Sequence, residues 1–146
     1  MSAEAGIDLV RRTWRLDGPY TTESVISAAA AIAELWRYLG HSTSTGTRRL
    51  LSDPADAHTL VGQLLAADQR ATDVLDRLGN WAIRMGDEST HTDRFGHDNP
   101  DGRRDQVQAT AHQAADLLRC AARAHSSAGH HLEQASGWLS HLYRND

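Results

Sequence analysis

The residues best suited to chemistry are histidines in the last third of the chain. His125 lies in an otherwise aliphatic row, and His130 and Glu133 lie one helical turn apart. Imidazole and carboxylate groups at that spacing can share a metal ion. A metal centre inside a helical bundle, however, draws carboxylates from several facing helices, and no further ligand is spaced to join these three residues. We therefore treat His125, His130 and Glu133 as weak metal candidates only and expect no cofactor.

His125 has two interpretations. In the functional interpretation, His125 is a buried switch or a metal ligand. The other is a core histidine that is hydrogen-bonded to a neighbouring helix, and we favour it because no second ligand lies three or four residues away.

Nucleophilic catalysis has little support in this sequence. The single cysteine, Cys120, is not part of a Cys–His–carboxylate order, and an incidental surface thiol is the simpler interpretation. The chain also lacks a Gly-rich loop that ends in Gly-Lys-Ser/Thr and would bind phosphate. We predict no catalytic residues and no enzymatic activity.

One long helix must position these residues. From Val107 to Leu142, apolar or small side chains recur in alternating steps of four and three, which is the heptad pattern of an amphipathic helix. One column of the pattern contains only alanine, so a neighbouring helix can approach it closely. The interaction residues expected on this helix are Ala114, Ala121, Ala128, Leu132 and Ala135.

A second long helix precedes it. Asp53-Pro54 is an N-cap followed by proline at the first helical position, and a heptad row of apolar residues then leads to Met85. Asn99-Pro100 repeats this start signal. The sequence therefore predicts long helices at about 54–85 and 100–143.

Two shorter helices are predicted before these, at about 3–16 and from Thr21 or Thr22 to Leu39, where Gly40 would end the helix. The Ser- and Thr-rich segment 41–52 is predicted to be a loop. Residues 86–102 are predicted to be a flexible polar loop. The fold class is all-α, an elongated antiparallel helical bundle with a coiled-coil pattern, forming one domain over residues 1–146.

Composition limits the possible partners. The net charge of −4 disfavours binding to nucleic acid or to an anionic membrane, although all 15 basic residues are arginine. No stretch is apolar for long enough to cross a membrane, and no signal peptide is evident. With a single cysteine, the expected location is the cytoplasm.

Three short motifs carry a resemblance: Arg37-Tyr38-Leu39-Gly40-His41, Pro54-Ala55-Asp56 and Val74-Leu75-Asp76-Arg77-Leu78. Over about a third of its length, the chain resembles uncharacterised small helical proteins of actinobacteria that have a RYLGH/xPAD/LLDxLxxW-like pattern. Some of those proteins are encoded near mobile elements. The resemblance implies a helical fold and an actinobacterial source, and it implies no activity.

Three functions remain open at this point. The leading one is a non-enzymatic protein–protein interaction or assembly module, expected to be a homodimer, that contacts its partner through an apolar groove or through Trp14, which is flanked by Arg12 and Arg15. The alternative is a regulatory or accessory protein of a mobile element that associates with nucleic acid. The third is a metal-binding helical bundle.

Overall fold

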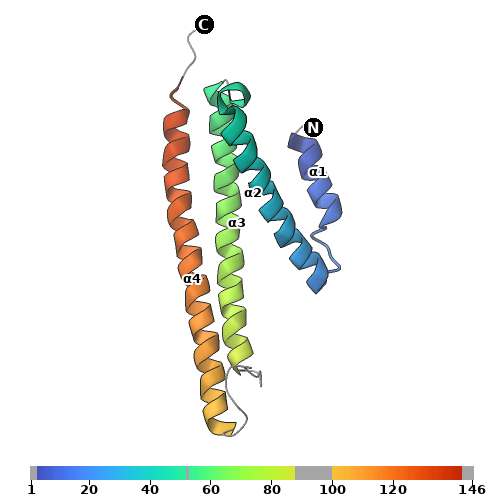
Figure 1. Cartoon of the computed structure of the whole chain (residues 1–146), viewed down its shortest axis with the longest axis vertical. Coiled ribbons are helices and arrows are strands. Elements are labelled where there is room, and N and C mark those ends of the chain that lie inside the picture. The colour runs from blue at the N-terminus through green and yellow to red at the C-terminus, as the bar shows by residue number, and fades with distance from the viewer. Residues whose placement is uncertain (1–2, 52, 88–99, 143–146) are drawn as a thin grey trace. The chain divides into compact units, whose positions relative to one another are not determined.

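The computed structural model describes residues 3–51, 53–87 and 100–142, and the regular elements in these residues are all helices (Figure 1). They are α1 (Ala3–Thr13), α2 (Thr22–Leu50), α3 (Pro54–Asp87) and α4 (Pro100–Leu139). The predicted all-α class and the two long helices are confirmed. The chain divides into two compact units, residues 1–52 and residues 53–146.

The first unit contains α1 and α2. Gly18, in a left-handed conformation with φ of 78°, and a cis Gly18–Pro19 bond lie between the two helices. Thr21 caps α2 reciprocally: its Oγ1 accepts a hydrogen bond from the Ser24 backbone N–H at 3.0 Å, and its own N–H donates to Ser24 Oγ at 3.1 Å. This exchange satisfies the backbone N–H groups of Thr21 and Ser24 at the exposed start of the helix.

The predicted end of the second helix at Leu39 is wrong. α2 continues through Gly40 and the Ser/Thr-rich segment to Leu50. Hydroxyl groups in this segment donate hydrogen bonds to backbone carbonyls of the same helix. Thr43 Oγ1 donates to the Leu39 carbonyl at 2.7 Å, and Ser44 Oγ donates to the His41 carbonyl at 2.9 Å. In these positions the hydroxyls bond to the preceding turn and do not compete with the helix for N–H groups.

The second unit is an antiparallel hairpin of α3 and α4 (Figure 1). α3 begins as predicted, because Asp53 Oδ1 accepts a hydrogen bond from the Ala55 N–H at 2.9 Å and Pro54 occupies the first turn. α4 ends at Leu139, somewhat before the predicted residue 143, which lies outside the described residues. Most of the predicted loop, residues 88–99, also lies outside them. No helix in the described part of the chain is both long and apolar enough to span a membrane.

Candidate interaction surface

Small side chains line the contact between α3 and α4. The most buried positions are Gly79, Ala82 and Gly86 on α3 and Val107, Ala115, Ala122 and Gly129 on α4. A Cβ added to Gly86 would lie 2.6 Å from the Ala111 Cβ, and one added to Gly79 would lie 3.4 Å from the Ala115 carbonyl oxygen. The two helices therefore approach closely because these positions carry little or no side chain.

Each helix faces the other with a row of residues that follows a period of three and four. We call these the contact rows. On α3 the row is His58, Val61, Leu65, Asp68, Thr72, Leu75, Gly79, Ala82 and Gly86. On α4 it is Ala111, Ala115, Leu118, Ala122, His125, Gly129, Leu132, Ser136 and Leu139. Every member is buried or half-buried, as expected for the seam of a helical pair.

The residue before each contact-row position is rotated by about 100° around its helix. Because α3 and α4 run in opposite directions, this rotation carries both sets to the same side of the hairpin. We call this the apolar side. It comprises Ala57, Leu60, Leu64, Ala67, Ala71, Val74, Leu78, Trp81 and Met85 on α3, with Thr110, Ala114, Leu117, Ala121, Ala124, Ala128, His131, Ala135 and Trp138 on α4.

The residue after each contact-row position lies on the opposite, polar side. Two observations support this assignment. Arg119 on α4 donates a hydrogen bond from Nη2 to the Asn80 Oδ1 on α3 at 3.1 Å, which joins two such positions. A hollow on the same side is lined by Gln69 and Asp73 of α3 and by Ser126, His130 and Glu133 of α4. Charged side chains such as Asp73, Arg119 and Glu133 thus lie on this side of the hairpin.

The apolar side contains no Asp, Glu or Arg, although such residues make up 23% of the chain. Five of its large side chains reach solvent, with exposed fractions between 44% and 76%, whereas Leu60, Leu64 and Met85 are half-buried. These exposed residues are Val74, Leu78, Trp81, Leu117 and Trp138. A contiguous exposed surface of this kind is typical of a site where another protein segment packs.

The alanine column that the sequence singled out lies on this apolar side. Ala114, Ala128 and Ala135 are exposed and Ala121 is half-buried. They therefore do not form the close contact with α3, which belongs to Ala115, Ala122 and Gly129, one residue further along. Leu132, by contrast, is half-buried in the contact row. The expected close approach occurs, but with the neighbouring column of α4.

A hydrogen-bonded pair joins the two helices at mid-length. Nδ1 of His125 is hydrogen-bonded to Oδ1 of Asp68. The Asp68 side chain is only 12% exposed, whereas that of His125 is 44% exposed. The second Asp68 oxygen, Oδ2, is buried without a hydrogen-bond partner. His125 therefore pairs with a residue of the neighbouring helix, as the favoured interpretation required, and it is partly open to solvent.

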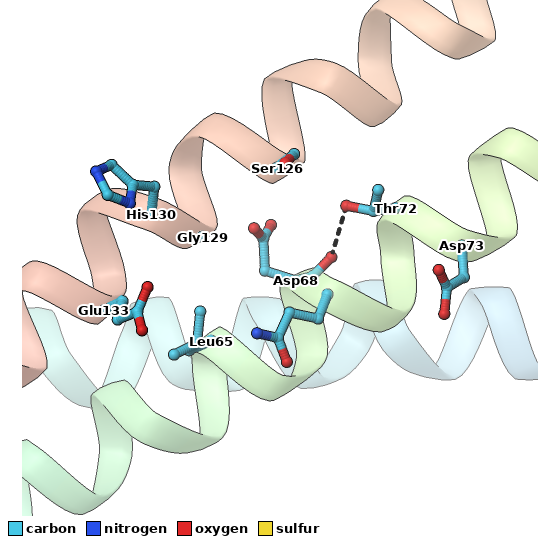
Figure 2. Close-up of a pocket in the computed structure, with 9 residues that line it drawn as sticks. Leu65, Asp68, Thr72, Asp73, Ser126, Gly129, His130 and Glu133 are labelled. Atoms are coloured by element: carbon cyan, nitrogen blue, oxygen red, sulfur yellow. Dashed lines mark hydrogen bonds between the residues drawn. The ribbon is translucent and has the colours of Figure 1, made fainter.

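Asp68 fits between the helices because of a glycine. Figure 2 shows its carboxylate pointing from α3 toward Ser126 and Gly129 of α4, at the edge of a hollow of about 370 Å³. A Cβ on Gly129 would lie 3.1 Å from Asp68 Oδ2. Thr72 Oγ1 donates to the Asp68 backbone carbonyl at 3.2 Å and leaves the carboxylate free for His125. Sequence reasoning missed Asp68, whose only signal was its place in the three-and-four period of α3.

The weak metal candidates do not come together. His125 lies in the contact row, while His130 lies on the polar side, where its Nε2 is 3.3 Å from the Gln134 side-chain nitrogen. Glu133 lines the same hollow as His130. Among the described residues, no three His, Cys, Asp or Glu side chains are grouped closely enough to hold a metal ion.

Trp14 is half-buried and so is less exposed than the anchor that the sequence suggested. It lines a hollow of about 320 Å³ in the first unit with Pro19, Tyr20 and Val25. Beside it, Arg15 and Asp17 form a two-point ion pair, with Nε–Oδ1 and Nη2–Oδ2 distances of 3.0 and 2.6 Å. This hydrogen bonding lowers the pKa of the Asp17 carboxyl and raises the pKa of the Arg15 guanidinium.

Comparison of the chain with protein-family models, curated proteins and solved structures finds no match.

Proposed function

We propose that the chain is a non-enzymatic protein-interaction module and that the apolar side of the α3–α4 hairpin is its contact surface. The observation that carries the proposal is the combination of contact rows whose most buried positions are glycine and alanine with large exposed apolar residues on an adjoining side that has no Asp, Glu or Arg. Two-helix pairs are ordinarily stabilised by large side chains in the seam. The contact rows contain some, such as Leu65 and Leu118, but Leu78 and Trp81 lie outside these rows and are exposed.

The energetic reason is the cost of leaving these side chains in water. Burial of apolar surface contributes about 25 cal/mol per Å², so a fully buried Leu or Val contributes roughly 1.5–3 kcal/mol relative to an exposed one. The hairpin alone leaves five large residues of this side exposed and so does not gain the free energy of burying them. A partner segment packed on this side would bury them.

Site-specific photocrosslinking tests the proposal. A photoreactive phenylalanine analogue is placed at Leu78 or at Ala128 on the apolar side, with Ser127 as the matched control. Ser127 adjoins Ala128, is also exposed, and lies about 100° around the helix from it, on the face of α4 turned away from α3. In cells that make the full chain, we expect covalent protein adducts from positions 78 and 128 and few from 127. Equal labelling at all three positions would contradict the proposal.

A further inference from the structure

We propose that the apolar side is covered by a second copy of this chain, so that two hairpins form a four-helix bundle around a two-fold axis. This inference rests on the proposed function, because it names the partner of the same surface. Three properties of the surface support a second copy: its charge, its distribution of large and small residues, and its size.

The absence of charge suits self-association. In a two-fold interface the same surface lies on both subunits, so a charged residue near the axis meets its own like-charged counterpart. Interfaces between different proteins avoid this conflict by pairing opposite charges across the contact. The apolar side has neither sign of charge, although the chain has 19 acidic residues and 15 basic ones. It therefore offers no complementary charge to a different partner and no repulsion to a second copy.

The apolar side is also complementary to itself in shape. Large apolar residues are more numerous in the α3 half, where they are Leu60, Leu64, Val74, Leu78, Trp81 and Met85. The α4 half has the alanine column of Ala114, Ala121, Ala128 and Ala135, and its large apolar residues are Leu117 and Trp138. A two-fold axis can place α3 of each copy over α4 of the other. Large side chains then pack against small ones twice, which is how ridges of one helix fill the grooves of another.

The available area matches a stable dimer. From residue 57 to residue 85 a helix rises about 42 Å, and two adjacent helices are about 20 Å wide. The apolar side therefore presents roughly 800 Å² per copy, close to the area that each partner contributes to a standard protein–protein interface. The surface of one hairpin is thus large enough to hold a second hairpin without any further contact.

The test is the mass of the full chain in solution, measured by light scattering on a sizing column at several concentrations. The variants are Ala128→Glu and Leu78→Glu, with Ser127→Glu as the control that adds the same charge to a neighbouring exposed position. Circular dichroism selects the concentrations at which the variants keep wild-type helix content. If Leu78→Glu fails to fold, Ala128→Glu decides, because an exposed alanine leaves no cavity when it is replaced.

We expect a wild-type mass of twice the chain's 16.0 kDa. Because the dimer would bury each added carboxylate without a partner, Ala128→Glu and Leu78→Glu should raise its dissociation constant by about tenfold or more, and Ser127→Glu should leave it unchanged. A dimer that tolerates both apolar-side variants would overturn the inference.

Hydroxyl-radical footprinting of Trp81 separates the remaining outcomes. A single-chain mass with Trp81 readily oxidised would overturn the second copy as the occupant but would leave the proposed interaction surface standing. A single-chain mass with Trp81 protected would mean that the chain covers its own apolar side, and this result would overturn both proposals.

Discussion

His125 on α4 is hydrogen-bonded through Nδ1 to Oδ1 of Asp68 on α3, between two rows of mostly apolar and small side chains. The bond joins residues 57 positions apart in the chain. Shifting either helix by one turn would separate the two groups and leave a mostly buried carboxylate without a partner. We infer that this pair fixes the register of the hairpin, a role that polar groups in helical seams can have.

The Asp68–His125 pair should show strong coupling in a double-mutant cycle. His125→Leu removes a hydrogen-bond partner of a carboxylate whose Oδ2 is already unsatisfied, so we expect a loss of about 1–3 kcal/mol in the free energy of unfolding. Asp68→Leu combined with His125→Leu should recover much of that loss. Urea denaturation of the four proteins measures the coupling. Additive effects of the two single changes would contradict a direct interaction.

Gly86→Ala should destabilise the hairpin. Its new Cβ would lie 2.6 Å from the Ala111 Cβ, so α4 must move, and overpacking of this kind costs about 1–3 kcal/mol. Gly62 in the same helix is the control, because nothing lies within 4 Å of a Cβ there, and Gly62→Ala should stabilise by about 0.5–1 kcal/mol. The thermal unfolding midpoint should fall in Gly86→Ala and rise in Gly62→Ala. Adding Ala111→Gly to Gly86→Ala should restore part of the stability, and failure to do so would place the strain elsewhere.

Gly40→Ala distinguishes the continuous α2 from the helix end that the sequence predicted. Gly40 lies inside α2 with open space around its Cα, so alanine should raise helix stability by about 1 kcal/mol through propensity alone. If Gly40 instead ended the helix in the left-handed conformation, alanine there would lower the stability. The change in thermal midpoint, followed by circular dichroism, is the measurement. A lower midpoint in the variant would argue for a helix that ends near Leu39.

The Arg15–Asp17 pair makes a prediction about pH. Its hydrogen bonds lower the pKa of Asp17 below the ordinary value of an aspartate, so its contribution to stability is present above that ordinary value and is lost as the pH falls through the lowered one. An NMR titration should find the lowered pKa, and Arg15→Gln should return it toward the ordinary value. Both groups are exposed, so added salt should weaken the effect. A pKa that is unchanged in Arg15→Gln would exclude this cause.

Helix starts and fold class were readable from the sequence because they depend on local signals, such as the Asp53-Pro54 cap and the heptad period. The sequence was less informative about which face of each helix contacts the other. Ala114 and Ala115 begin two neighbouring columns of similar hydrophobicity, so apolar character alone does not decide which column faces α3. The column that faces α3 contains Gly129, where an added Cβ would lie 3.1 Å from Asp68 Oδ2 of α3, whereas the neighbouring column has Ala128 at this level. That comparison requires both helices at once.

The extent of α2 and the role of Asp68 were missed for different physical reasons. Serine and threonine after Gly40 favour a loop by propensity, but their hydroxyls bond to carbonyls of the preceding turn and the helix continues. Asp68 is an acidic residue in an apolar row, which sequence reasoning assigns to the outer surface. Its partner, His125, lies on another helix, and no local spacing relates the two.

The exposed large residues of the apolar side have a consequence for how the protein is handled. If these large side chains are buried only in an assembly, folding and association are linked, and the midpoint of thermal unfolding rises with protein concentration. Dilution would then act as a denaturant. A preparation that is well folded at high concentration would lose helix on dilution below the dissociation constant, and the amount of the chain in a cell would decide how much of it is folded.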